Sequence, residues 1–379
     1  MKDVIIVGGG PAGLHAAYQL ASAGLDVSLL DAQKQIGERA VCSGVIGMEA
    51  FSRFGLPVAS VINTIKRVQA FSPAGRKIEH FGEEPLARVV NKAEFNRDLA
   101  DRAVAAGTEL RLGKFVESIE QKKQNVVVRY RSKDGPQQES VKARAAIIAS
   151  GVNRSLTERL GLVRPRDYLR GIQADIPLGK DGMARPTEIY VGQSVAPGAF
   201  GWKIPLGHGR VRVGLMSSEE PRPYFKKLLQ AVAPHLQPDQ YTVCQKVITQ
   251  WPHGKCATDR ILVIGEAAGH VKTTTGGGIY YGLLSAEMAA EVLARGFERN
   301  DLSEQALSAF EPYCRSAFSR ELETGYFFRK LMAKLPDSLL DKTFEKARAI
   351  DLFGRVNGNL IFDWHYKAIL IAIQHLFTA

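Results

Sequence analysis

Two glycine-rich segments, far apart in the 379-residue chain, constrain its fold more than any other feature. The first follows the apolar run at residues 4–7 and reads GGGPAG at residues 8–13. This order predicts a buried parallel strand, a tight turn and a helix whose N-terminus faces a pyrophosphate. The residues that we expect at the pyrophosphate are Gly8, Gly10, Pro11, Ala12 and Gly13.

An acidic residue completes this unit. The expected helix ends near Gly24, and a second apolar strand at residues 27–30 leads into Asp31. In dinucleotide-binding units an acid roughly 20 residues after the glycines accepts hydrogen bonds from the ribose hydroxyls. Strand, helix, second strand and acid are all present, which argues against a glycine-rich turn without a ligand.

The second glycine segment separates FAD from NAD. It begins with an apolar run at residues 261–264, continues as Gly265-Glu266, and leads to TGGGIYY at residues 275–281. The segment is similar to one in FAD enzymes of the glutathione-reductase type, and this resemblance implies that Gly265 and Glu266 lie near the ribityl or pyrophosphate region. A helix beginning near Gly278 would direct its positive end toward the flavin ring and stabilise its reduced form.

Composition excludes several other classes of protein. The net charge is +11, but the basic residues are scattered rather than gathered with aromatics, so we predict no nucleic-acid binding. The four cysteines lack C-x-x-C spacing, so we expect neither a disulfide framework nor a metal site. No signal peptide is evident and no apolar run reaches about 18 residues, which predicts a cytoplasmic protein without a spanning helix.

The pattern of expected elements predicts an α/β fold with a discontinuous FAD domain of the glutathione-reductase type. A β-rich, mostly antiparallel substrate domain is inserted into it, and the chain ends in a helical region. The predicted boundaries are 1–70, 90–160 and 255–298 for the FAD domain, 71–89 and 161–254 for the substrate domain, and 299–379 for the helical region.

Three further motifs carry a family resemblance. They are Val-Cys-Ser-Gly at residues 41–44, FGWKIP at residues 200–205, and TTGGGIYYG at residues 274–282. With them the chain resembles the geranylgeranyl reductase family of flavoproteins, within the para-hydroxybenzoate hydroxylase-like fold. The resemblance covers residues 1 to about 300. It implies further FAD contacts at Ala40, Val41, Cys42, Lys92, Ser150, Gly151, Gly277, Gly278 and Ile279.

The chain departs from this family at several positions. Lys92 and Asn96 stand where relatives have Arg and Asp, so a bidentate contact of Lys92 with the cofactor is in doubt. Glu266 replaces the usual Asp, and Ser150-Gly151 replaces Asp-Gly. Ser150, together with the absence of a proline at residues 273–275, disfavours an oxygen-using hydroxylase. A halogenase, which shares most of the motif at residues 200–205, and a quinone-reducing flavoprotein remain alternatives.

The resemblance implies a reductase that saturates carbon–carbon double bonds of a polyprenyl chain by hydride transfer from flavin N5. The substrate would be a prenyl-chain lipid or a prenyl diphosphate, and the electron donor would be NADPH or a reduced ferredoxin. The expected catalytic residues are Cys42 and Tyr280, and the expected substrate contacts are Phe200, Trp202 and Pro205.

Two features allow a plainer interpretation. His270 matches no known acid or base of the family, and we interpret it as a solvated loop residue. The apolar helix expected over residues 364–377 would either dock on the protein body or lie at a bilayer surface, bringing the enzyme to a lipid substrate.

Overall fold

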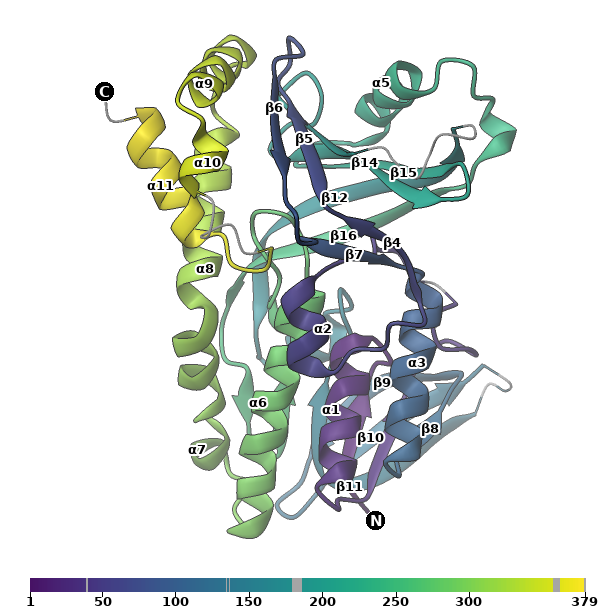
Figure 1. Cartoon of the computed structure of the whole chain (residues 1–379). Helices are drawn as coiled ribbons and strands as arrows, with labels where there is room; N and C mark the ends of the chain where they lie inside the picture. The colour runs from purple at the N-terminus through teal and green to yellow at the C-terminus, as the bar shows by residue number, and fades with distance from the viewer. Residues whose placement is uncertain (39, 134, 136, 179–185, 357–361, 378–379) are drawn as a thin grey trace.

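The computed structural model describes the chain except for residues 39, 134, 136, 179–185, 357–361 and 378–379. Its elements form a large mixed sheet with helices, a second large sheet above it, a small sheet between the two, and a run of C-terminal helices along one side (Figure 1). The predicted fold class is confirmed.

The first sheet contains the apolar strands expected from the sequence. Its order is β17-β18-β11-β1-β2-β8, and the hairpin of β9 and β10 extends it at β11. The strands are β1 (Lys2–Val7), β2 (Val27–Leu30), β8 (Glu109–Arg111), β9 (Lys114–Gln121), β10 (Val126–Ser132), β11 (Gln138–Ile148), β17 (Ala257–Thr258) and β18 (Ile261–Val263). Strands β1, β2, β8, β11 and β18 pair in parallel. The glycine turns therefore lie at the same edge of the sheet, because carboxyl ends of parallel strands share an edge.

Three helices pack with this sheet. They are α1 (Pro11–Ser22), α3 (Lys92–Ala105) and α6 (Ile279–Glu298), and α1 contacts both of the others. Gly24 and Gly107, which follow α1 and α3, have φ of 83° and 106°. Both glycines thus take a conformation that other residues rarely adopt, which explains why these helices end there.

The second sheet gathers strands from two separate parts of the chain. Its order is β16-β12-β15-β14-β13-β5-β6. The strands are β5 (Arg67–Phe71), β6 (Lys77–Phe81), β12 (Arg164–Pro177), β13 (Thr187–Val191), β14 (Phe200–Gly207), β15 (Arg210–Ser217) and β16 (Val243–His253). All of its pairs are antiparallel except that of β5 with β13. Helix α5 (Arg222–Val232) packs with β12 and β15.

A small sheet lies between the two large ones. It pairs β7 (Ala87–Val90) with β3 (Val45–Gly47) and β4 (Val61–Ile65). Helix α2 (Met48–Phe54) follows β3, and α3 follows β7 after Asn91. The Asn91 side chain accepts hydrogen bonds from the backbone N–H groups of Ala93 and Glu94 and so caps α3.

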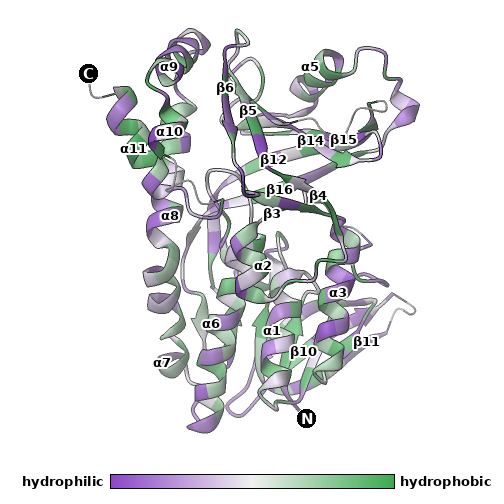
Figure 2. Cartoon of the chain, viewed as in Figure 1, coloured by the Kyte–Doolittle hydropathy of each residue, from purple (hydrophilic) through white to green (hydrophobic). Residues whose placement is uncertain are grey.

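The remaining elements of the described chain are helical. They are α4 (Ser155–Arg159), η1 (Pro238–Gln240), η2 (Gly265–Ala268), α7 (Glu304–Leu307), α8 (Phe310–Met332), α9 (Asp337–Ala349), α10 (Leu352–Val356) and α11 (Tyr366–Phe377). Helix α11 is largely hydrophobic (Figure 2) and contacts α8, α9 and α10. Within it Ile369 is buried, whereas Leu370 is 54% exposed. None of the described helices combines the length and apolar character needed to cross a membrane.

Candidate functional site

The turn between β1 and α1 leaves space for a ligand where the sequence predicts the pyrophosphate. A Cβ at Gly8 would overlap the Ala149 carbonyl, and one at Gly13 would overlap the Gly8 carbonyl. At Gly10 no atom of the described residues lies within 4 Å of the position that a Cβ would occupy. Helix α1 begins at Pro11 without a side-chain cap. Its N–H groups and positive dipole end are therefore available to an anion.

Asp31 lies at the end of β2 beside this turn. Its carboxylate is buried, and Oδ2 accepts a hydrogen bond from the Gly9 N–H at 2.6 Å. Oδ1 accepts from the Gln33 N–H at 2.7 Å. The acid that was expected to bind a ribose thus also holds the glycine turn in place.

Lys92, at the start of α3, is a buried cation without an acidic partner. Its side chain is bonded to the neutral Asn96 amide, and no described carboxylate forms an ion pair with it. Burial, aided by the nearby Lys246 ammonium, lowers the pKa of Lys92 to about 8. A buried charge needs a counter-charge. An anionic group of a cofactor would supply it, although Lys92 lacks the planar fork of an arginine.

Glu266 and Lys246 form an ion pair close to Lys92. Their charged atoms are 2.6 Å apart, and the Glu266 carboxylate is close to Gly151. Burial lowers the pKa of Lys246, but the Glu266 carboxylate outweighs it, and the pKa is raised overall. The neighbouring Ser150 hydroxyl donates to the Asn153 carbonyl at 2.8 Å. The Glu266 carboxylate is therefore paired with a lysine of β16.

A polar cavity of about 450 Å³ opens where α3 faces the second sheet. Ala40, Val41, Cys42 and Lys92 line it from one side, and Arg212 from the other. Arg212 forms a bidentate pair with Asp175 and donates to the Ser43 carbonyl at 2.7 Å. It thereby fixes the Val-Cys-Ser-Gly turn. The open α1 N-terminus, the unpaired Lys92 charge and this cavity fit the phosphates and ribityl chain of FAD.

The second glycine segment forms the other end of the site. Gly276 has φ of 70°, and α6 begins after Gly278 without a side-chain cap. A Cβ at Gly277 would lie 2.8 Å from Cε of Lys272. The sequence predicts that Gly277 and Gly278 let the flavin ring approach the backbone closely. The geometry shows that Gly277 also makes room for the Lys272 side chain.

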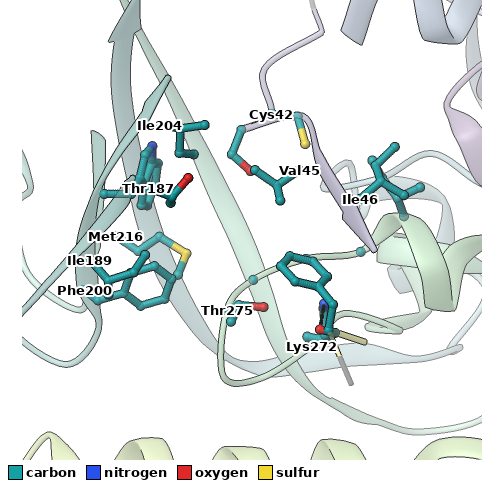
Figure 3. Close-up of a pocket in the computed structure, with 18 of the residues that line it drawn as sticks. Cys42, Val45, Ile46, Thr187, Ile189, Phe200, Ile204, Met216, Lys272 and Thr275 are labelled. Atoms are coloured by element: carbon teal, nitrogen blue, oxygen red, sulfur yellow. Dashed lines mark hydrogen bonds between the residues drawn. The ribbon is translucent and has the colours of Figure 1, made fainter. Parts of the chain in front are cut away.

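A second cavity, of about 340 Å³, lies beside this loop and is mainly apolar. Cys42, Val45 and Ile46 lie on one side of it, opposite Ile189, Phe200 and Met216 (Figure 3). Four of its lining residues carry buried polar atoms without a hydrogen-bond partner in the described structure: Thr187 Oγ1, Trp202 Nε1, Thr275 Oγ1 and Asp363 Oδ2. Because most of its wall is apolar, the cavity suits an apolar ligand, and these few polar atoms remain able to bond a polar group of it.

Two of the three predicted substrate residues line this cavity. Phe200 and Trp202 lie on β14 with ring centroids 5.9 Å apart, and Ile204 continues the same face. Pro205 is not among the residues found to line it, because successive side chains of a strand point to opposite faces. The Pro205 carbonyl instead accepts a hydrogen bond from Asn63 at 2.8 Å. The structure thus brings Ile204, rather than Pro205, to the cavity.

Tyr280 and Cys42 both line the apolar cavity but differ in surroundings. The Tyr280 hydroxyl donates to Glu49 at 2.5 Å, and burial together with this carboxylate raises the pKa of Tyr280. The Cys42 thiol is partly exposed and accepts from the Gly44 N–H at 3.4 Å. Cys42 also lines the polar cavity, so it lies on the boundary between the two.

The interpretation of His270 as a solvated loop residue is wrong. The side chain is 4% exposed, and its ring packs edge-on against Phe318 with centroids 5.0 Å apart. Burial lowers the pKa of His270 to about 3. The apolar side chains of α8 account for this, because they cover a loop that looks exposed when only local sequence is considered.

Sequence reasoning missed the contribution of residues 362–366, which we call the C-terminal segment. Lys272 Nζ lies 2.7 Å from Asp363 Oδ1, and both side chains are almost fully buried. The Thr274 hydroxyl and His365 Nδ1 are 2.8 Å apart. Lys272, Asp363 and His365 all line the apolar cavity. A lysine in a loop of small and apolar residues was the available signal, because a buried charge must find a partner.

Glu321 of α8 holds the same segment from the other side. Its carboxylate accepts hydrogen bonds from the backbone N–H groups of His365 at 2.7 Å and Tyr366 at 2.9 Å. These N–H groups belong to the start of α11, so Glu321 caps that helix. The Tyr281 hydroxyl adds a bond to the Asp363 carbonyl at 2.5 Å. These bonds fix the C-terminal segment against the loop at residues 272–278, which we call the flavin-edge loop because the flavin ring is expected there.

Comparison with known proteins agrees with this geometry. The family described as FAD binding domain matches residues 1–317. A digeranylgeranylglycerophospholipid reductase of Methanothermobacter thermautotrophicus is 30% identical over 92% of this chain and 92% of its own.

Solved structures share the fold. A geranylgeranyl bacteriochlorophyll reductase-like protein of Thermoplasma acidophilum has a TM-score of 0.86 at 23% identity, covering 100% of this chain and 96% of its own. A flavin-dependent brominase has a TM-score of 0.73 at 16% identity, covering 98% and 97%. The sequence relatives and the family match together show that this chain belongs to the geranylgeranyl reductase family of FAD-dependent oxidoreductases.

Proposed function

We propose that this oxidoreductase saturates carbon–carbon double bonds in the polyprenyl chain of a lipid. The observation that carries the proposal is the mainly apolar cavity, which adjoins the uncapped N-terminus of α6 where the flavin ring is expected. Reduced FAD, when bound, supplies a hydride from its N5 atom. The chain itself contributes orientation, a dry apolar wall and the proton that completes each reduction.

The cavity walls favour an isoprenoid over a compact polar substrate. Phe200, Trp202 and Ile204 form one continuous apolar face, and Val45 and Ile46 face it. Burial of each methylene contributes roughly 0.8 kcal/mol, so a long chain gains binding energy without polar contacts. The name of the 30% identical relative, which acts on a digeranylgeranylglycerophospholipid, supports a prenyl-chain lipid; a prenyl diphosphate is the second form of the same substrate class.

Of the two expected catalytic residues, Cys42 is the better placed to donate the proton. Its thiol lies at the cavity wall, whereas the Tyr280 hydroxyl is bonded to Glu49 and has a raised pKa. Cys42→Ala should therefore retain FAD and lose double-bond reduction. Tyr280→Phe should lose less, because its ring can keep its packing against Trp364 at 5.6 Å. Equal losses in the two variants would contradict this assignment.

Mass spectrometry of lipid extracts tests the function directly. Extracts incubated with dithionite-reduced enzyme should contain prenyl lipids that have gained two hydrogens for each double bond reduced. Halogenation or hydroxylation of an aromatic substrate in air, with no change in the lipids, would overturn the proposal. Separate assays with NADPH and with reduced ferredoxin identify the donor, and vesicle binding tests bilayer contact through the exposed Leu370 of α11.

A further inference from the structure

We infer that Lys272, held by Asp363, tunes the reduction potential of the bound flavin. The inference rests on FAD lying with its ring at the α6 N-terminus, as in the proposed function. It concerns a buried ion pair that joins the flavin-edge loop to the C-terminal segment. Neither residue belongs to the glycine motif.

The position of the ammonium group is fixed by three contacts. Nζ of Lys272 lies 2.7 Å from Asp363 Oδ1 and 3.0 Å from the Phe362 carbonyl. It also lies 4.4 Å from the centre of the Phe362 ring. The Lys272 backbone N–H donates to the Gly277 carbonyl at 2.9 Å, and the Gly276 N–H donates back to the Lys272 carbonyl. The charge is thus attached rigidly to the glycine loop.

The Lys272 ammonium lies on the side of the loop where the flavin ring is expected. Lys272 lines the apolar cavity together with Gly276, Gly277 and Gly278. Its Nζ is 3.5 Å from the point that a Cβ of Gly277 would occupy. The N-terminus of α6, which has no side-chain cap, begins at the next residues. The ammonium and the helix dipole therefore act on the same edge of a flavin placed there.

Burial makes the effect large. The Lys272 and Asp363 side chains are 3% and 4% exposed, so water screens their charges weakly. A flavin gains negative charge when it is reduced, and a fixed cation at its edge stabilises that charge. Asp363 opposes this effect because its negative carboxylate is paired with the Lys272 ammonium and offsets part of its charge. The two residues should therefore shift the potential in opposite directions.

Spectroelectrochemical titration of the FAD-bound protein measures this directly. Lys272→Met removes the cation at similar length and should lower the equilibrium constant for two-electron reduction at least tenfold, about 30 mV more negative. Asp363→Asn removes the counter-charge and should make the potential more positive. A purely structural role of the pair would not give shifts of opposite sign.

A matched control comes from the Lys203–Glu188 ion pair of β14 and β13, whose side chains are 11% and 14% exposed. Neither residue is found to line the apolar cavity, so Lys203→Met should leave the potential unchanged. Unchanged potentials in Lys272→Met and Asp363→Asn, or shifts in the same direction, would overturn the inference. If Lys272→Met fails to fold or to retain FAD, Asp363→Asn decides alone, and an unchanged or lower potential refutes it.

These outcomes are independent of the substrate. The titration needs only bound FAD and reports a potential rather than turnover. Failure to find reduced lipids would overturn the proposed function and leave the opposite shifts standing. Conversely, lipid reduction with unchanged potentials would refute only the role of Lys272.

Discussion

The two ends of the candidate FAD site are built in different ways. The pyrophosphate end uses consecutive residues: a strand, the glycine turn at residues 8–13 and the start of α1, with Asp31 close by in sequence. The flavin-edge end joins the loop at residues 272–278 to Asp363 and His365, which lie far along the chain. The first end depends on glycines and on an acid that lies close to them in sequence, whereas the second depends on charged side chains from a distant segment.

This difference implies different responses to substitution. At Gly10, in the pyrophosphate end, the essential property is empty space, so a side chain added there should remove the ligand while the fold survives. At the flavin-edge end the loop is held by hydrogen bonds and an ion pair to the helical region, so a lost side chain should weaken the fold as well as the site.

The largest expected effect tests the first half of this comparison. Gly10→Glu would fill the open space before α1 with a carboxylate and should abolish FAD binding, because it would overlap and repel the pyrophosphate. The apoprotein should fold, since no atom in the described part of the chain lies within 4 Å of the added Cβ. Flavin absorbance per protein and far-ultraviolet circular dichroism measure the two outcomes.

Gly135→Glu is the matched control for this prediction. A Cβ at Gly135 also meets no atom within 4 Å, but the residue follows the β10 strand, away from the glycine turn. This variant should retain full flavin occupancy. Full occupancy in Gly10→Glu as well would show that the pyrophosphate does not lie at α1.

The same contrast explains how much could be predicted from the sequence. Local patterns were enough for β1, α1, β2 and α6, and for the ends of helices at Gly24 and Gly107. The motif at residues 200–205 led to a strand that lines the apolar cavity, yet period-two geometry decides that Ile204 rather than Pro205 faces it. The Lys272–Asp363 pair and the burial of His270 depend on packing between distant segments, which no local pattern encodes.

The second prediction tests the stability of the flavin-edge end. Lys272→Met leaves the Asp363 carboxylate buried without its partner and should lower the free energy of unfolding of the apoprotein by about 3–5 kcal/mol. Urea denaturation measures it. The double variant Lys272→Met with Asp363→Leu should recover part of the loss, because it removes the uncompensated charge.

The matched control for this prediction is a surface pair. Lys122→Met removes a cation that is bonded to Glu120, where the side chains are 53% and 41% exposed, and it should change stability little. A loss in Lys272→Met no greater than that in Lys122→Met would mean that the C-terminal segment does not depend on the buried pair.

The third prediction concerns pH at the same end. Burial lowers the pKa of His270 to about 3, below the ordinary 6.5, so the unfolded chain binds a proton more readily than the folded one. The stabilisation is complete above pH 6.5 and is lost as pH falls toward the folded pKa. At pH 5 this costs roughly 2 kcal/mol. Urea denaturation at pH 7 and pH 5 measures the free energy of unfolding of the wild type and of His270→Leu. Acidification should lower it by roughly 2 kcal/mol less in His270→Leu than in the wild type. Identical pH dependence would mean that His270 does not stay neutral in the folded protein.

The smallest expected effect concerns the apolar cavity beside the flavin-edge loop. Trp202→Ala removes the largest part of the wall formed with Phe200, whose ring lies 5.9 Å away. Long prenyl chains should lose about tenfold in kcat/KM, because they use more of this apolar face than short chains do, and the flavin spectrum should stay unchanged. Assays with prenyl substrates of increasing length measure the ratio. Pro205→Ala serves as the control, since Pro205 lies on the opposite face of β14 and should not alter the dependence on chain length. If long and short substrates lose the same factor in Trp202→Ala, Trp202 is a packing residue, and the prenyl chain binds along another wall of the cavity.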